Sequence, residues 1–181
     1  EEKRIPMLRY YKVFNLEQVD GIEDPDKDET KEHKPIEEAE TIVKGMPERP
    51  EVRHKEQRAF YSLAGDFVNM PKPETFGCPE EYYSTLFHEL GHSTRHEKRL
   101  NREKSNYAQE ELVAEMTAAF LCGVTGIENK TLENATAYID HWRKRVSEDV
   151  RLVVMAGAQA QRASDYIQGI VRDKDKKNGE E

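Results

Sequence analysis

The sequence has little of what stabilises secreted and membrane proteins. Its 181 residues include two cysteines, Cys78 and Cys122, which are too few for a disulfide framework. No apolar run approaches the ~20 residues that a membrane-spanning helix needs. We therefore expect a soluble, cytoplasmic protein that has no membrane partner and keeps both thiols reduced.

The chain also lacks the basic excess of a free-standing nucleic-acid-binding domain. It has 28 Lys and Arg against 36 Asp and Glu, and 28 − 36 gives a net charge of −8 at neutral pH. Binding to DNA requires a cluster of cations that neutralises several phosphates. The densest basic segment, 95–104, is interleaved with Glu97 and Glu103 and has no aromatic residue for base stacking. We expect this chain alone to bind single-stranded DNA weakly or not at all.

A single domain accounts for the length, which is sufficient for a sizeable core. The sequence contains no internal repeats. We expect one domain over residues 1–172, followed by a polar tail over 173–181 that frays. Because the chain begins with Glu1 and not Met, we also expect that it has been trimmed or that an upstream domain is absent from it.

The first half of the sequence predicts short strands and one helix. Aromatic and β-branched residues near alternate positions predict strands over 7–16, 58–62 and 66–70. Pro71 and Pro73 end the last of these, which places it at a sheet edge where it can offer its backbone to an extended peptide. An amphipathic helix is expected over 35–44.

From Pro79 onward the apolar spacing becomes helical. The helix that begins at Pro79 carries a core-facing apolar stripe, made of Tyr83, Leu86, Phe87 and Leu90. The next helix runs from Tyr107 to Cys122, with Gly123 as its C-cap. Thr131 and Ser147 can cap two further helices, the last reaching Ile167. Strands followed by helices give an α+β fold, with a small sheet packed against a helical bundle.

Residues 88–92 carry the strongest chemical signal, His-Glu-Leu-Gly-His, inside the helix that begins at Pro79. His88 and His92 lie one helical turn apart on one face, so that both rings can bind one Zn²⁺. Glu89 lies beside that face, where it can act as a general base on a water without binding the metal. Two solvated histidines on a charged helix would be the alternative.

A catalytic zinc site usually has a third protein ligand. Glu111 and Glu115 lie on one stripe of the next helix, with Ala118, which lets the two helices approach closely. One carboxylate would bind the zinc, and the other would accept the N–H of a ligand histidine. His96, four residues beyond His92, is expected at the rim or as a supporting residue.

These residues resemble the C-terminal metallopeptidase domain of the ArdC family of antirestriction proteins, a module similar to one in plasmid TraC-type primases. The shared segments are YYKVFN at 10–15, QVDG at 18–21, AFY at 59–61, DFVNMP at 66–71, YYSTL at 82–86, HELGH at 88–92, EELVAE at 110–115, AYI at 137–139 and ASDYI at 163–167. The resemblance implies a zincin-like fold and zinc held by the two His and a Glu. It also implies antirestriction function and a separate N-terminal domain, absent here, that binds single-stranded DNA.

The resemblance also suggests how the two acids divide their roles. Residues 111–115 resemble the E-x-x-A-D element of other zincins, with Glu in place of the final Asp. By this similarity Glu111 is the third zinc ligand, and Glu115 supports a ligand histidine.

Together these features predict a zinc-dependent peptidase domain that acts on a peptide or protein. Glu89 would take a proton from the attacking water and deliver it to the leaving amine. Three residues are candidates for stabilising the oxyanion: Tyr107, Tyr138 and His141. The alternative is a non-hydrolytic, zinc-containing module that binds a protein partner or supports a DNA-binding domain. The presence of Glu89 favours hydrolysis, because a structural zinc site does not require a general base.

Overall fold

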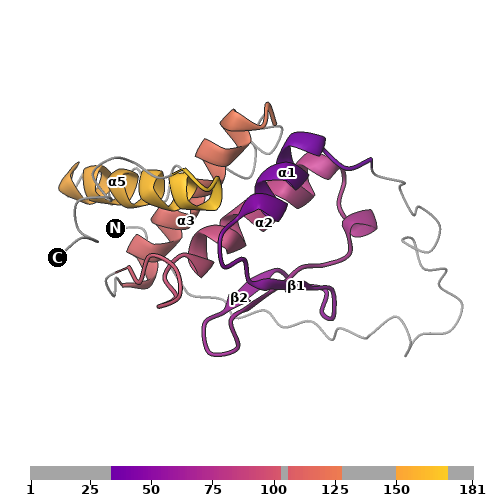
Figure 1. Cartoon of the computed structure of the whole chain (residues 1–181), viewed down its shortest axis with the longest axis horizontal. Helices are drawn as coiled ribbons and strands as arrows, with labels where there is room; N and C mark the ends of the chain where they lie inside the picture. Colours follow the sequence, from indigo (N-terminus) through magenta and orange to yellow (C-terminus); the bar gives the residue numbers. More distant parts are fainter. Residues whose placement is uncertain (1–33, 103–105, 128–149, 171–181) are drawn as a thin grey trace, which may run out of the picture. The chain divides into compact units, whose positions relative to one another are not determined.

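The computed structural model describes residues 34–102, 106–127 and 150–170, all of which belong to one compact unit, Lys31–Glu181. In chain order the elements are α1 (Glu37–Gly45), β1 (Glu51–Arg53), β2 (Phe60–Ser62), β3 (Phe67–Asn69), the 3₁₀ turn η2 (Pro73–Thr75), α2 (Pro79–Ser93), α3 (Tyr107–Val124) and α5 (Val150–Ile167) (Figure 1). The strand predicted over 7–16, the helix predicted from Thr131 and the polar tail lie outside the described residues.

The described strands form a three-stranded sheet in the order β1-β3-β2. The predicted hairpin is confirmed, because β2 pairs antiparallel with β3. The prediction that this second strand lies at an edge is wrong, because β1 pairs with β3 in parallel on its other side. Pro71 does not prevent this arrangement, since the last bond toward β1 comes from the residue before it: the Met70 N–H donates to the Arg53 carbonyl at 2.8 Å.

The helices begin as the sequence predicts. Helix α1 spans Glu37–Gly45, within a residue or two of the predicted ends, and α2 starts at Pro79. The N-terminus of α3 has a capping box in which Asn106 and Gln109 each accept the other's backbone N–H. The predicted C-cap at Gly123 is wrong. The helix continues through Val124, and the glycine that adopts a left-handed conformation after it is Gly126, with φ of 67°.

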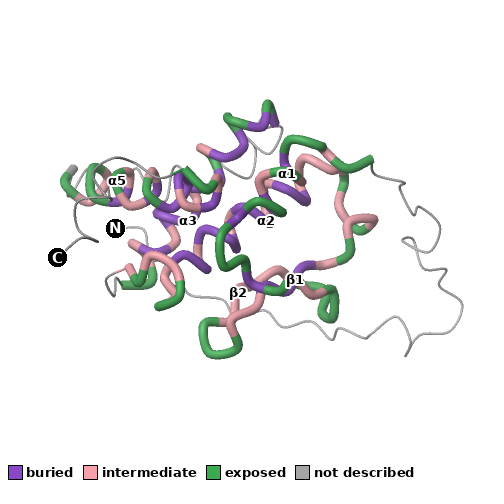
Figure 2. The backbone as a smooth tube through the Cα atoms, viewed as in Figure 1, coloured by how far each residue is buried: buried purple, intermediate pink, exposed green. Residues whose placement is uncertain are grey.

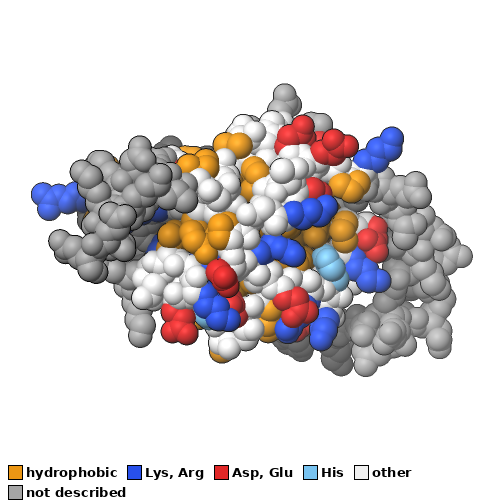
Figure 3. Space-filling model, viewed as in Figure 1, with side chains coloured by type: hydrophobic (Ala, Val, Ile, Leu, Met, Phe, Trp, Pro, Cys, Tyr) orange, Lys and Arg blue, Asp and Glu red, His pale blue; other side chains and the backbone are white. Residues whose placement is uncertain are grey.

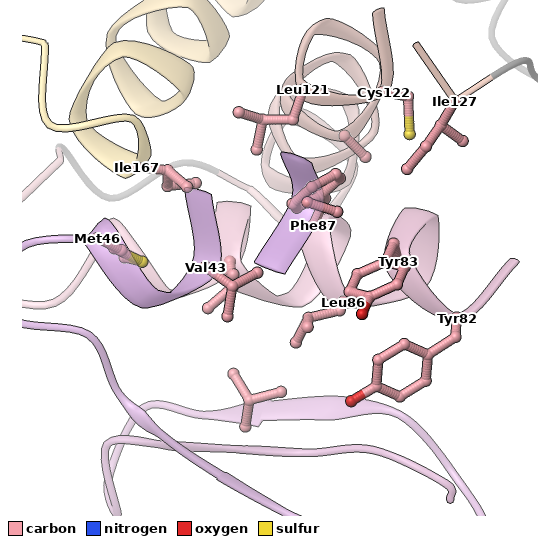
Figure 4. Close-up of a cluster of buried hydrophobic side chains, with 14 of the residues drawn as sticks. Val43, Met46, Tyr82, Tyr83, Leu86, Phe87, Leu121, Cys122, Ile127 and Ile167 are labelled. Atoms are coloured by element: carbon pink, nitrogen blue, oxygen red, sulfur yellow. The ribbon is translucent and has the colours of Figure 1, made fainter. Parts of the chain in front are cut away.

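Apolar side chains from all four described helices meet in one core (Figure 4). Helix α2 contributes the predicted stripe of Tyr83, Leu86, Phe87 and Leu90, each no more than 3% exposed. Figure 4 also labels Tyr82 of α2 and six side chains from α1 and its C-cap, from α3 and the turn after it, and from α5: Val43, Met46, Leu121, Cys122, Ile127 and Ile167. Figure 2 shows the same pattern along the backbone, with the buried face of α2 turned toward its neighbours.

Helix α2 packs against α3 at a glycine. A Cβ on Gly91 would lie 3.2 Å from the Ala114 Cα and 3.3 Å from the Thr117 Cβ, both on α3. We expected Ala118 to permit the close approach, and it is buried, but the tightest measured contact lies one turn earlier. Gly91 belongs to the motif at 88–92, so the same five residues carry both histidines and the helix contact.

The described surface shows mixed charge. Lys and Arg side chains alternate with Asp and Glu over the face seen in Figure 3, and orange apolar atoms lie between them. Among residues 34–102, 106–127 and 150–170, no helix has the length and apolar character needed to cross a membrane.

Candidate metal centre

The two histidines of α2 point at each other. Their ring centroids are 4.7 Å apart, and His88 Nε2 lies 3.1 Å from His92 Nε2. Both side chains are largely buried, at 18% and 16% exposed. Helical spacing places the rings on one face, as the sequence predicts, and the packing of α3 across that face turns both Nε2 atoms toward one point.

Glu111 of α3 completes the group. Its Oε2 lies 3.6 Å from His88 Nε2, and its Oε1 lies 3.5 Å from His92 Nε2. One ligand atom from each of the three residues can be chosen so that all lie within 4.8 Å of one another. Tetrahedral zinc, with bonds of about 2.0–2.1 Å, holds its ligand atoms about 3.3 Å apart. The observed separations bracket that value, so the N₂O set fits a small divalent ion.

Each ring also has a carboxylate at its other nitrogen. Glu115 Oε1 lies 3.5 Å from His88 Nδ1, and Glu110 Oε1 lies 3.2 Å from His92 Nδ1. An ionised carboxylate only accepts hydrogen bonds, so these contacts would keep a hydrogen on each Nδ1 atom and leave both Nε2 lone pairs for an ion when one is bound. Sequence reasoning singled out Glu115 and missed Glu110. Glu110 lies off the stripe that singled out Glu111 and Glu115, so that pattern did not point to it.

The charges of the group favour a cation. The hydrogen bond with His88 lowers the pKa of Glu111 against the effect of its partial burial, helped by His92 and by a hydrogen bond from the Tyr107 hydroxyl. Burial lowers the pKa of His88, but the bond to Glu111 and the charges of Glu115 and Glu89 outweigh it and raise this pKa above its usual value. Glu111 is therefore charged at neutral pH, and positive charge on the rings or on a bound ion would balance it.

Glu89 is placed differently from the other acids. It is 8% exposed, and burial raises its pKa, although His88, His92 and a hydrogen bond from the Tyr61 backbone lower it. A carboxylate with a raised pKa is a better acceptor for a proton near neutral pH. The bond to Tyr61 links this helical residue to strand β2.

A cavity of about 600 Å³ opens over the group. Its lining joins β2 and the turn after it to the facing sides of α2 and α3: Ala59, Phe60, Tyr61, Leu63, His88, Glu89, His92, Arg95, Tyr107, Glu110 and Glu111. The structure therefore brings Tyr107, a candidate oxyanion donor, to the same cavity as the histidines. The other two candidates, Tyr138 and His141, lie outside the described residues.

The structure places His96 away from this cavity lining. Helix α2 ends at Ser93, so the four-residue spacing from His92 does not continue along one helical face. The Nδ1 atom of His96 accepts the Lys98 N–H at 3.2 Å and lies 3.9 Å from Asp66 Oδ2. His96 thus faces the residue that precedes β3.

The chain is similar to known proteins in sequence and in fold. Residues 37–159 match the zincin-like metallopeptidase family MPTase-PolyVal. A DNA primase TraC of Escherichia coli is 34% identical over 169 residues, which cover 90% of this chain and 16% of the primase. The protein y4eC of Sinorhizobium fredii is 31% identical over 173 residues, covering 92% of this chain and 56% of that protein.

Two solved structures are similar as well, both of the antirestriction protein ArdC from plasmid R388 and both 33% identical with a TM-score of 0.60. The Mn(II)-bound structure matches over 88% of this chain and 61% of ArdC. The metal-free structure matches over 95% and 65%. The chain thus spans less than two thirds of the length of each of these relatives. The shared α+β fold and the match over more than half of the chain show that it belongs to the zincin-like metallopeptidase family.

Proposed function

We propose that this chain is a metal-dependent peptidase domain in which His88, His92 and Glu111 hold a zinc ion. The observation that carries this proposal is the close approach of their donor atoms. The two Nε2 atoms are 3.1 Å apart, and the two Glu111 oxygens lie 3.5 Å from His92 Nε2 and 3.6 Å from His88 Nε2. A Mn(II)-bound structure of the related ArdC supports a divalent cation as the ligand. The choice of zinc rests on the ligand set, since imidazole with one carboxylate suits zinc.

A bound divalent ion supplies Lewis-acid chemistry, which polarises a carbonyl and makes water more acidic. The chain's own contribution centres on Glu89. Its carboxylate accepts a proton from the attacking water and later gives it to the leaving amine. Burial assists this role by raising the pKa of Glu89, and the Tyr61 N–H holds the carboxylate at the cavity wall. Tyr107, in the same cavity, is the described candidate for donating to the oxyanion.

Strand β2 is the element on which we propose that a peptide lies. It is an edge strand of the described sheet, whereas β3, the strand predicted for this role, is paired on both sides. Residues of β2 and its flanks, among them Ala59 and Leu63, line the cavity that contains Glu89. An extended peptide that pairs with β2 would run past the metal group, with apolar side chains against this wall.

The relatives named DNA primase and antirestriction protein place such a domain in DNA-processing proteins. We propose that this chain serves in that setting, with contacts to single-stranded DNA made by another domain. The net charge of −8 supports this division. Titration of a labelled oligonucleotide at ~0.15 M salt tests it, and submicromolar binding by this chain alone would contradict it.

The function is tested by measuring metal and hydrolysis in the same preparations. The purified 181-residue chain should bind one zinc and cleave members of a quenched-fluorescence peptide library. Glu89→Gln should keep the zinc but lose at least about 10²-fold in hydrolysis, since an amide cannot accept the proton. Glu97→Gln, an exposed acid beyond α2, is the matched control and should behave like the wild type.

Two results would reject parts of this proposal. If the wild type binds no metal, the site assignment fails. If it binds metal but cleaves nothing, or if hydrolysis survives Glu89→Gln, the peptidase assignment fails while the metal site stands, and the non-hydrolytic module becomes the better explanation.

A further inference from the structure

Arg102 forms the most extensive set of side-chain hydrogen bonds near the metal group, by which we mean His88, His92 and Glu111. Its Nε–H donates to Thr94 Oγ1 at 2.9 Å. Its Nη1 donates to Glu110 Oε2 at 3.0 Å and to Gln159 Oε1 at 3.3 Å. Its Nη2 donates to Glu110 Oε1 at 2.6 Å and to the Gly91 carbonyl at 3.2 Å. All five guanidinium N–H groups are therefore used, and the bonds join α2, α3 and α5.

Glu110, whose carboxylate accepts two of these bonds, also faces His92 of the metal group. The side chains of Arg102 and Glu110 are each 5% exposed. Arg102 donates to both oxygens of Glu110, at 3.0 and 2.6 Å, a bidentate arrangement that is typical of an ionised carboxylate. An ionised Glu110 can only accept, so the His92 Nδ1 atom, 3.2 Å away, must carry the hydrogen.

We propose that the Arg102–Glu110 pair positions His92 for metal binding, by fixing its ring in the Nδ1–H tautomer with the Nε2 lone pair toward Glu111 and His88. This inference rests on the proposed metal site and adds the residues that set its geometry. Arg102 holds both oxygens of Glu110 in a fork, so that the carboxylate cannot rotate away from the ring. Carboxylates that bind a ligand histidine commonly contribute about 10–100-fold to metal affinity.

A second buried pair on the same loop supplies the control. Arg99 is fully buried and donates to Asp66, to the Tyr61 hydroxyl at 3.0 Å and to the Ser93 and Glu48 carbonyls at 2.6 and 2.7 Å. It therefore resembles Arg102 in burial and in bonding. The difference lies in its carboxylate partner, Asp66, which precedes β3. Among the described residues, the cations that pair with Asp66 are His96, Lys98 and Arg99, and neither His88 nor His92 is one of them.

The test compares isosteric loss of charge in the two pairs, using the full chain. Zinc affinity is measured by competition with a chromophoric chelator, and stability of the metal-free protein by urea unfolding. Glu110→Gln should weaken zinc binding about 10–100-fold. Asp66→Asn should leave zinc affinity within about twofold of the wild type, as expected for an independent site, although it also removes a buried charge.

Arg102→Lys keeps the positive charge but cannot bind both carboxylate oxygens, so it should weaken zinc binding by less than Glu110→Gln does. If the Glu110→Gln variant does not fold, Arg102→Lys becomes the deciding variant. The tautomer is read directly from long-range ¹H–¹⁵N spectra of the metal-free wild type, where the His92 ring should be protonated on Nδ1. An ion pair that contributed only to stability would not determine which ring nitrogen of His92 carries the hydrogen.

The inference is overturned if Glu110→Gln, or Arg102→Lys in its place, binds zinc as tightly as the wild type. It is also overturned if Asp66→Asn weakens zinc binding equally, because the pairs would then act only through stability, or if metal-free His92 is protonated on Nε2. A wild type that binds no zinc at all would instead refute the proposed metal site itself, so the two failures are distinguishable.

Discussion

Different interactions stabilise two regions of the molecule. The helix side is where α2 packs on α3, and the sheet side consists of β1–β3 and their loops. On the helix side the contact is apolar and close, with Gly91 against Ala114. On the sheet side the central feature is a buried polar residue. Asn69 is 2% exposed, and its side chain makes four bonds to the main chain of the loop between β1 and β2.

The difference follows from element length. Each strand has three residues and cannot bury much apolar area, so the loop between β1 and β2 depends on hydrogen bonds for its shape. Helices of 15 and 18 residues bury a continuous stripe instead. The two sides meet at Glu89, which is on α2 and is bonded to the Tyr61 backbone of β2. Metal binding should therefore depend on the helix side, and the placing of Glu89 and the peptide on the sheet side.

The largest expected effect comes from forcing the helix side apart. In Gly91→Val the new side chain meets the Ala114 main chain, which cannot move like a flexible side chain, so we expect about 3 kcal/mol of destabilisation. Zinc binding should weaken too, because Glu111 moves away from both rings. Urea unfolding and chelator competition measure the two effects.

The matched control lies on the partner helix. Gly123 is also helical, but a Cβ there meets nothing within 4 Å, so Gly123→Val should be neutral or slightly stabilising. Equal destabilisation by the two substitutions would show that the close contact at Gly91 is not what sets the spacing of α2 and α3.

A smaller effect is expected on the sheet side, and it should depend on pH. Burial raises the pKa of Asp66, but hydrogen bonds from Arg99 and Tyr61 outweigh burial and hold this pKa below its usual value of 3.8. Lys98 and His96 also face this carboxylate. A lowered folded-state pKa gives stability that is present above the unfolded pKa and lost as the pH falls through the folded one.

Asp66→Asn should therefore cost about 1.5–3 kcal/mol at neutral pH. The gap between variant and wild type should shrink as the pH drops from 5 to below the usual Asp pKa of about 3.9, a range in which histidines stay charged. Urea unfolding at a series of pH values measures the gap. A gap that widens on acidification, or that is absent at pH 7, would mean that the ionised form of Asp66 does not stabilise the sheet side.

The sequence predicted the helix side better than the sheet side, for physical reasons. A helical period tells which way each side chain points, so the stripe containing Leu86 and Leu90 and the shared face of His88 and His92 followed directly. Strand β1 was missed because its three residues, Glu51–Arg53, are too few for an alternating pattern to be recognised. The edge assignment of β3 failed for the same reason, since its second neighbour was unseen.

Glu110 shows the limit on the helix side. It lies between Gln109 and Glu111, two other polar residues. Its own side-chain contacts include Arg102, which precedes α3, and His92 of α2. Such a contact between distant segments leaves no period in the sequence. The adjacent Glu111 was singled out together with Glu115 because both lie on one stripe with Ala118, and the zincin resemblance then indicated Glu111 as the ligand; neither argument pointed to Glu110.

The smallest expected effect concerns the carboxylate on the other ring. Glu115 faces His88 Nδ1 much as Glu110 faces His92 Nδ1, but its side chain is 43% exposed against 5% for Glu110. Water can replace an exposed carboxylate as a hydrogen-bond acceptor, and exposed pairs contribute about 0.2–1 kcal/mol. Glu115→Gln should therefore weaken zinc binding only about two- to fivefold, below the usual range for such residues. Chelator competition on Glu115→Gln, Glu110→Gln and the double variant measures this. If Glu115→Gln weakens zinc binding more than Glu110→Gln does, burial does not decide how much each carboxylate contributes to zinc affinity. The zincin resemblance, which gives Glu115 the supporting role, would then be the better predictor.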